Sequence, residues 1–173
     1  MAIVIIQLSD LHFAAAAADN ILLQRTDALC GALRAQTSPG DSCAVVISGD
    51  IVDKGQQGGY QIAGDFLEKV FLELSAHLGN DPCFILVPGN HDHDFSDPSH
   101  DEQMRTTLIE STSPSTPPSS GIHNVLMATQ EPYREFVAKA AGNLPTLAVD
   151  GLFASGTWEP DGTSLQFHLL NTT

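Results

Sequence analysis

Basic residues are scarce in this sequence: seven Lys and Arg stand against twenty-one Asp and Glu, which gives a formal net charge of −14. A surface this acidic repels the phosphates of DNA and RNA at long range, so the composition counts against a protein that wraps nucleic acid. A bound cation can still capture a single phosphate locally. If some of the carboxylates are metal ligands, cations would also neutralise part of the acidity.

Cysteine is sparse too, and long apolar runs are missing. The cysteines, Cys30, Cys43 and Cys83, make an odd count without a CxxC spacing, which favours buried reduced thiols over a zinc or redox site. No stretch approaches the roughly 18 apolar residues of a membrane span, and no basic segment precedes the apolar run at 3–6. We therefore expect a cytoplasmic protein without a membrane partner.

The 173 residues, 42% of them hydrophobic, are enough for one domain with a real core. Apolar runs at 3–8, 43–48 and 83–87 predict fully buried strands. Between them, apolar spacing predicts one helix that begins near Asp19 and Asn20, which are plausible cap residues, and a second over 60–78. This order indicates parallel strands joined by helical crossovers.

The second half of the chain has a different character. Residues 111–120, rich in Ser, Thr and Pro, form a low-complexity loop that cannot pack a core. A helix is expected over 127–141. Strands are expected at 146–154 and 164–170, as a hairpin across the turn at 159–162. His168 is expected to face outwards from its strand.

Polar side chains follow each of the first three strands. These segments are Ser9-Asp10-Leu11-His12, Gly49-Asp50-Ile51-Val52-Asp53 and Gly89-Asn90-His91-Asp92. Ligands of parallel α/β sheets bind beyond the carboxyl ends of the strands, so the three loops should meet at one edge. Oxygen and imidazole ligands suit Mn, Fe, Zn or similar ions. Two such ions can neutralise a phosphate, activate a water and stabilise in-line displacement.

The three segments resemble the DxH, GDxxD and GNHD blocks of the calcineurin-like metallophosphoesterases, over about residues 3–92. The end of the chain, residues 167–172, is similar to a later core strand of that family. The resemblance implies a layered α-β-β-α fold, with two mixed sheets flanked by helices. It also implies a phosphate-ester substrate and two divalent cations, with Mn favoured.

Carried over residue by residue, the resemblance assigns four metal ligands: Asp10, His12, Asp50 and Asn90. Asp10 and His12 would hold the first metal, Asp50 would bridge both, and Asn90 would bind the second. A metal-bridging hydroxide would attack phosphorus, and His91 would protonate the leaving oxygen. Asp53 would support His91, with Asp92 as the other candidate for that role.

Two later blocks of the family, a lone His and GHxH, are absent, since His100, His123 and His168 stand in other contexts. We expect residues 1–173 to be the N-terminal portion of a single domain. The remaining metal ligands would then come from further C-terminal residues or from another chain. A non-catalytic binding module on a degenerate fold is the alternative.

Two further features bear on the substrate. Lys54 follows Asp53 where the family's protein phosphatases carry a phosphate-gripping Arg, and it is either a phosphate ligand or a solvated lysine. The order of the blocks and the residues in them look closest to the phosphodiesterase branch, with the DNA nuclease branch as runner-up. The polar run His93, Asp94, Asp97, His100 and Asp101 is expected to be a solvated loop and not an additional metal cluster.

Overall fold

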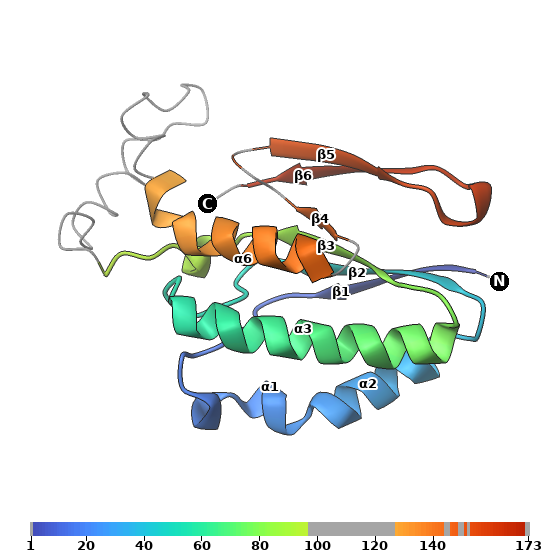
Figure 1. The fold of residues 1–173 in the computed structure, drawn as a ribbon, viewed down its shortest axis with the longest axis horizontal. Helices are drawn as coiled ribbons and strands as arrows, with labels where there is room; N and C mark the ends of the chain where they lie inside the picture. Colours follow the sequence, from blue (N-terminus) through green and yellow to red (C-terminus); the bar gives the residue numbers. More distant parts are fainter. Residues whose placement is uncertain (1, 97–126, 144–145, 149–150, 152, 172–173) are drawn as a thin grey trace.

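The computed structural model of the chain describes residues 2–96, 127–143, 146–148, 151 and 153–171 (Figure 1). Its larger sheet has four parallel strands in their order along the chain: β1 (Ile3–Leu8), β2 (Ser42–Ser48), β3 (Cys83–Val87) and β4 (Thr146–Ala148). Neighbouring strands pair in register, with Ile6 opposite Val45 and Val45 opposite Phe84. All the carboxyl ends therefore lie at one edge.

One face of this sheet is covered by the crossover helices (Figure 1). These are α1 (Ile21–Gln24) and α2 (Thr26–Ala35) between β1 and β2, and α3 (Gln57–Leu78) between β2 and β3. The apolar stripe of α3, which includes Phe66, Val70 and Leu74, is buried in one core with Val45 and Leu86 of the sheet. Helix α3 ends at Gly79, whose φ of 76° is the left-handed conformation that glycine adopts readily.

The other face is covered by an antiparallel hairpin of β5 (Phe153–Trp158) and β6 (Leu165–Leu170). Leu169 packs there with Ala44 and Ile85. Helix α6 (Glu131–Asn143) packs against α3 and β4, and the buried Tyr133 hydroxyl donates to the Leu86 carbonyl at 3.1 Å. The molecule is thus layered, with helices, a parallel sheet and a β-hairpin in succession.

Several expectations are confirmed. As predicted, helices alternate with β1, β2 and β3, although the first crossover comprises two helices, α1 and α2, and not the single helix expected from near Asp19. The three cysteines are buried free thiols, and β5 and β6 form a hairpin with the 3-10 turn η4 (Pro160–Gly162) between them. His168 is exposed on the outer face of the hairpin, where its ring stacks on Phe153. Among the described residues, no helix combines the length and apolar character that crossing a bilayer requires. The low-complexity stretch 111–120 lies outside the described residues.

Three local expectations are wrong. The strand at 3–8 is not fully buried: β1 lies at one edge of the four-stranded sheet, and Ile5 is 56% exposed, because the described hairpin contacts the faces of β2, β3 and β4. The stretch 146–154 is not one strand, since β4 joins the parallel sheet while β5 starts the hairpin. Asn20 does not cap its helix with its side chain, which instead bonds the backbone of Ala14 and Ala16.

Candidate metal centre

Three loops at the carboxyl edge of the sheet are tied together through their backbones. The N–H groups of Asp10, His12 and Phe13 donate to the carbonyls of residues 49, 50 and 51, at 3.2, 3.0 and 3.0 Å. A parallel bridge between Phe13 and Val52 continues the pairing beyond the named strands. The third loop joins through the N–H of Gly55, which donates to the His91 carbonyl at 2.7 Å. The polar residues on these loops are therefore held in a fixed relation.

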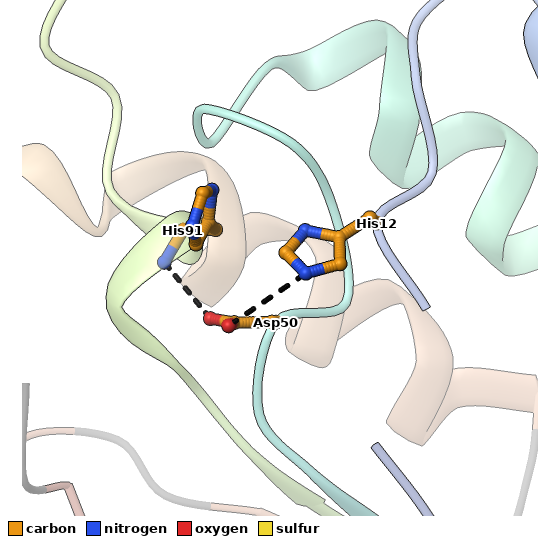
Figure 2. A group of neighbouring side chains, drawn as sticks. All are labelled: His12, Asp50 and His91. Carbon is orange, nitrogen blue, oxygen red and sulfur yellow. Dashed lines mark hydrogen bonds and ion pairs between the residues drawn. The ribbon is translucent and has the colours of Figure 1, made fainter. Parts of the chain in front are cut away.

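Figure 2 shows the result: His12, Asp50 and His91 come from three different loops and converge on one point. One possible ligand atom from each lies within 4.8 Å of the others. His12 Nε2 lies 3.9 Å from both Asp10 Oδ1 and Asp50 Oδ2. The rings of His12 and His91 meet edge to face, with centroids 4.6 Å apart. Two imidazoles and one carboxylate at this spacing fit a divalent cation of the Mn, Fe or Zn kind, and Asp10 adds a second carboxylate beside His12.

The backbone is strained at the candidate ligands themselves. Asp10, His12 and Asp50 have φ angles of 56°, 47° and 53°, in the left-handed region that non-glycine residues seldom occupy. Such conformations persist only where the surroundings over-determine them, and they cluster at functional sites. Here the cross-loop hydrogen bonds hold the strained backbone in place. The strain is thus associated with the convergence of these side chains.

Gly89 allows the closest approach between the second and third loops. A Cβ atom on this residue would lie 2.2 Å from Asp50 Oδ1 and 2.3 Å from Asp50 N. Because glycine leaves that space open, Asp50 Oδ1 can accept the N–H of His91 at 2.9 Å. The other oxygen, Oδ2, remains directed at His12. One carboxylate therefore orients the His91 loop and also faces the cluster.

Asp92 is fully buried, and its carboxylate joins the second and third loops. Its Oδ2 accepts the N–H groups of Ile51 and Gly89 at 3.1 and 2.8 Å, and its Oδ1 accepts Val52 N–H and the Tyr60 hydroxyl at 3.1 and 3.0 Å. Burial raises the pKa of the Asp92 carboxyl, and these four donors act against the rise. Asp92 is thus committed to the loop backbone and is not directed at a substrate.

The two candidate partners of His91 are separated by this arrangement. The Asp53 carboxylate lies 3.4 Å from His91 Nδ1, with both side chains about two-fifths exposed. Asp92 is turned into the core. Asn90 is exposed, and it lines a hollow shared with Asp10 and Asp50. The structure therefore brings all six predicted site residues to the same edge of the sheet.

The structure bears on the expectations for two residues beside the site, Lys54 and His93. Lys54 is exposed and lines a hollow with Asn90 and His91. His93 is not part of a solvated loop, because only 4% of it is exposed. Its Nδ1 lies 2.6 Å from Thr129 Oγ1 and its Nε2 lies 2.9 Å from Gln130 Nε2. The later polar residues Asp97, His100 and Asp101 lie outside the described residues.

The sequence did not predict that the Tyr60 hydroxyl donates to the buried Asp92 carboxylate. Tyr60 was visible only as one apolar position in a helical stripe, and no local pattern connects it to a residue 32 positions later. The buried polar pair His93 and Gln130 was missed for the same reason, since it joins segments 37 residues apart. A short polar motif records which residues are present and not which backbone groups they bind.

The fold and the site together define a class. A parallel sheet carries His, Asp and Asn at its carboxyl edge, with helices on one face and a β-hairpin on the other, and this is the metallophosphoesterase fold. The sequence model of the calcineurin-like phosphoesterases matches residues 3–151, and the chain belongs to that family. Family membership indicates a metal-dependent hydrolase of phosphate esters. A search among curated proteins found no match to the chain.

Proposed function

We propose that this protein hydrolyses phosphodiesters with the help of two divalent cations, with Mn²⁺ favoured. Asp10, His12, Asp50 and Asn90 would hold the cations, and Asp50 would stand between them. The observation that carries the proposal is the convergence of His12, Asp50 and His91 within 4.8 Å, at the edge where the strands of the sheet end. Asp10 adds a carboxylate 3.9 Å from His12 Nε2.

When bound, the cations supply charge neutralisation at the phosphate and a water acidic enough to attack phosphorus near neutral pH. The residues of the chain supply position and a proton. The Asp53 carboxylate lies 3.4 Å from His91 Nδ1, where it can accept a hydrogen bond from the Nδ1–H group and so orient the ring. His91 in its imidazolium form then gives its Nε2 proton to the leaving oxygen as the bond to phosphorus breaks.

His91 has a competing role, because its ring also belongs to the group of atoms that could hold a metal ion. The proposal assigns His91 to proton transfer, since Asp53 lies beside His91 Nδ1 and the backbone N–H of His91 already donates to Asp50. The two roles predict different results for His91→Ala. Loss of an acid lowers kcat and leaves the number of bound Mn²⁺ ions unchanged, whereas loss of a ligand lowers both.

Charge favours a diester among the possible substrates. A phosphodiester carries one negative charge and a monoester carries two near neutral pH, so a chain with a net charge of −14 repels the diester less. The same charge acts more strongly against nucleic acid, which presents many phosphates at once. A small phosphodiester is therefore preferred to DNA.

The test is hydrolysis by the full-length protein with Mn²⁺, using bis-p-nitrophenyl phosphate, cyclic nucleotides and DNA as substrates. Asp50→Asn and His91→Ala are the informative variants. Asp81→Asn is the matched control, because Asp81 is exposed and precedes β3, at the opposite end of that strand from the site. Loss of activity in the first two variants and not in the control supports the proposal. If the protein is inert with every metal and ester, the proposal is refuted. The alternative of a non-catalytic binding module would then remain.

A further inference from the structure

Two exposed basic side chains, Arg25 and Lys54, line hollows that reach the candidate metal centre, and neither has an ion pair among the residues that the structure describes. Most other described basic residues form salt bridges: Arg34 with Glu73, Lys69 with Asp27 and Arg134 with Glu131. Only Lys139, which lines a hollow with Phe136, also lacks one in that part of the chain. A sequence with seven Lys and Arg thus keeps two unpaired cations beside its metal ligands.

Arg25 is the one whose position the proposed mechanism does not use. It lines a hollow of about 470 Å³ together with Asp10 and His12. His91 lies on the other side of Asp50 from His12 (Figure 2). Because His91 is proposed to protonate the leaving oxygen, the leaving group is expected on the His91 side. The hollow that contains Arg25, called the Arg25 hollow below, is then open to the substituent that stays on phosphorus.

The backbone of Arg25 is held in a fixed relation to the first metal loop. Helix α1 ends at Arg25, whose N–H donates to the Leu22 carbonyl at 3.0 Å. The start of the same helix is tied to the loop by the buried Asn20, whose side chain accepts Ala14 N–H at 2.8 Å and donates to the Ala14 carbonyl at 3.0 Å. Since Ala14 follows His12 by two residues, the base of the Arg25 side chain cannot move far from the site.

A guanidinium group suits an anionic oxyacid. It stays charged at any ordinary pH, and its planar set of N–H donors can bind two oxygens of one carboxylate or phosphate. Ser9 adds a hydroxyl to the hollow, and Ile21 adds apolar surface. An exposed arginine without a partner loses no existing salt bridge when such a group binds.

Two sources of negative charge oppose an anionic ligand here. The net charge of −14 acts at long range, but salt screens exposed charges beyond about 8 Å at physiological ionic strength. The hollow itself contains Asp10, which a bound cation would neutralise, and the exposed Asp19 of the 3-10 helix η1 (Ala17–Asp19). A charge-assisted contact with the guanidinium is stronger than the repulsion from an exposed carboxylate in solvent.

We propose that the Arg25 hollow binds a second anionic group, a carboxylate or a phosphate, on the retained substituent of the diester. Arg25 is its ligand and thereby selects charged diesters over neutral ones. The inference rests on the proposed function, since it is the role of His91 as proton donor that places the leaving group on the other side of Asp50.

Turnover of three matched diesters tests this selection. Each is a p-nitrophenyl phosphate ester whose second substituent is 4-carboxyphenyl, 4-phosphonophenyl or 4-carbamoylphenyl, and release of p-nitrophenol is measured at physiological ionic strength. Wild type should cleave at least one of the two anionic esters with a kcat/KM about ten-fold above that of the amide, the worth of one charge-assisted contact. The anion with the larger gain identifies the natural group.

The variants separate a local contact from a general effect of charge. Arg25→Gln should remove the preference, and Arg25→Lys should retain part of it, because lysine keeps the charge and loses the planar fork. Arg34→Gln is the matched control, since it removes the same charge from a residue that pairs with Glu73 on α3. Equal cleavage of the three esters by wild type, or an equal loss of preference in Arg34→Gln, would overturn the proposal.

Binding without turnover distinguishes failure of the hollow from failure of the enzyme. With Mn²⁺ present, calorimetry should show 4-carboxyphenylphosphonate or 1,4-phenylenediphosphonate binding about ten times more tightly than 4-carbamoylphenylphosphonate, and Arg25→Gln should remove that difference. If no ester is cleaved while this difference is found and lost as expected, the proposed function fails and the anion subsite stands. Equal affinity of the wild-type protein for all three phosphonates would overturn the subsite, whatever the esterase result.

Discussion

Replacement of Asp92 by asparagine tests whether a buried carboxylate organises the metal loops. Each oxygen of Asp92 accepts two hydrogen bonds. The amide of Asp92→Asn has one oxygen and one NH₂, and the NH₂ has no lone pair to offer. The better orientation places it beside Val52 N–H and Tyr60, because the Tyr60 hydroxyl can turn and accept. Val52 N–H then has no acceptor.

The expected loss of stability can be estimated from these contacts. One unsatisfied buried N–H costs about 1–3 kcal/mol, and the bonds from Ile51 and Gly89 lose about 1 kcal/mol in total when their acceptor becomes neutral. Removal of a buried charge offsets part of this, because burial had raised the pKa of Asp92. We expect the free energy of unfolding to fall by about 2 kcal/mol in Asp92→Asn.

Urea denaturation of the metal-free protein measures this loss, and Tyr60→Phe is the matched control. Tyr60→Phe removes one donor from the same carboxylate and leaves the three backbone bonds in place, so it should cost only about 1 kcal/mol. Only Asp92→Asn should also weaken Mn²⁺ binding, because it releases the loop that carries Asp50. A stability within 0.5 kcal/mol of wild type, or equal metal affinity in the two variants, would refute this account.

The pH dependence has a definite sign. The raised pKa means that the folded state holds the Asp92 proton more tightly than the unfolded state does. This contribution to stability is therefore fully present below the unfolded value of about 3.9 and is lost as the pH rises through the folded pKa. A protonated acid oxygen keeps an acceptor lone pair for Val52 N–H while it donates to Tyr60, whereas an amide nitrogen can donate to Tyr60 and cannot accept from Val52 N–H. The stability advantage of wild type over Asp92→Asn should widen as the pH falls from 7 towards 4.

Three further predictions concern single residues. Gly89→Ala should weaken Mn²⁺ binding in a titration, because its Cβ would lie 2.2 Å from Asp50 Oδ1, whereas Gly64→Ala in α3, where a Cβ meets nothing within 4 Å, should leave binding unchanged. Asp53→Asn should lower kcat about ten-fold with the metal content unchanged, because Asp53 lies 3.4 Å from His91 Nδ1. An equal loss of metal would assign Asp53 to the ligands instead. Burial raises the pKa of Cys43 and Cys83 to about 11, so iodoacetamide at pH 8 should modify them only after denaturation, and rapid labelling of the native protein would contradict the buried positions.

Much of the fold could be predicted because it follows from local patterns. The apolar runs at 3–8, 43–48 and 83–87 have the composition of strands, and the stripe along α3 repeats every three to four residues. Their alternation implies parallel strands, and parallel strands bring their carboxyl ends to one edge. The prediction of a shared site for Asp10, Asp50 and His91 therefore needed only the order of elements and the polar residues after each strand.

The errors arose where the outcome depends on distant contacts. Nothing in Ile3–Leu8 distinguishes an edge strand from a central one, because that depends on which strands pair with it and on where the hairpin lies. The split between β4 and β5 has the same origin, since the two halves of one apolar stretch pair with different sheets. His93 is polar in composition, and its burial depends on Thr129 and Gln130, more than 30 residues away.

The sequence by itself determined the class of site: three strand ends, each followed by Asp, His or Asn, in the order of a metal-dependent phosphoesterase. The tertiary structure alone decided how those residues meet. In the folded chain the Asp50 backbone has a φ of 53°, the Asp53 carboxylate lies beside His91 Nδ1, and the Asp92 carboxylate accepts hydrogen bonds from the loop backbone. The physical reason is that ligand types are a property of composition. Their geometry depends on hydrogen bonds across about 40 residues of chain, which form only when the sheet has assembled.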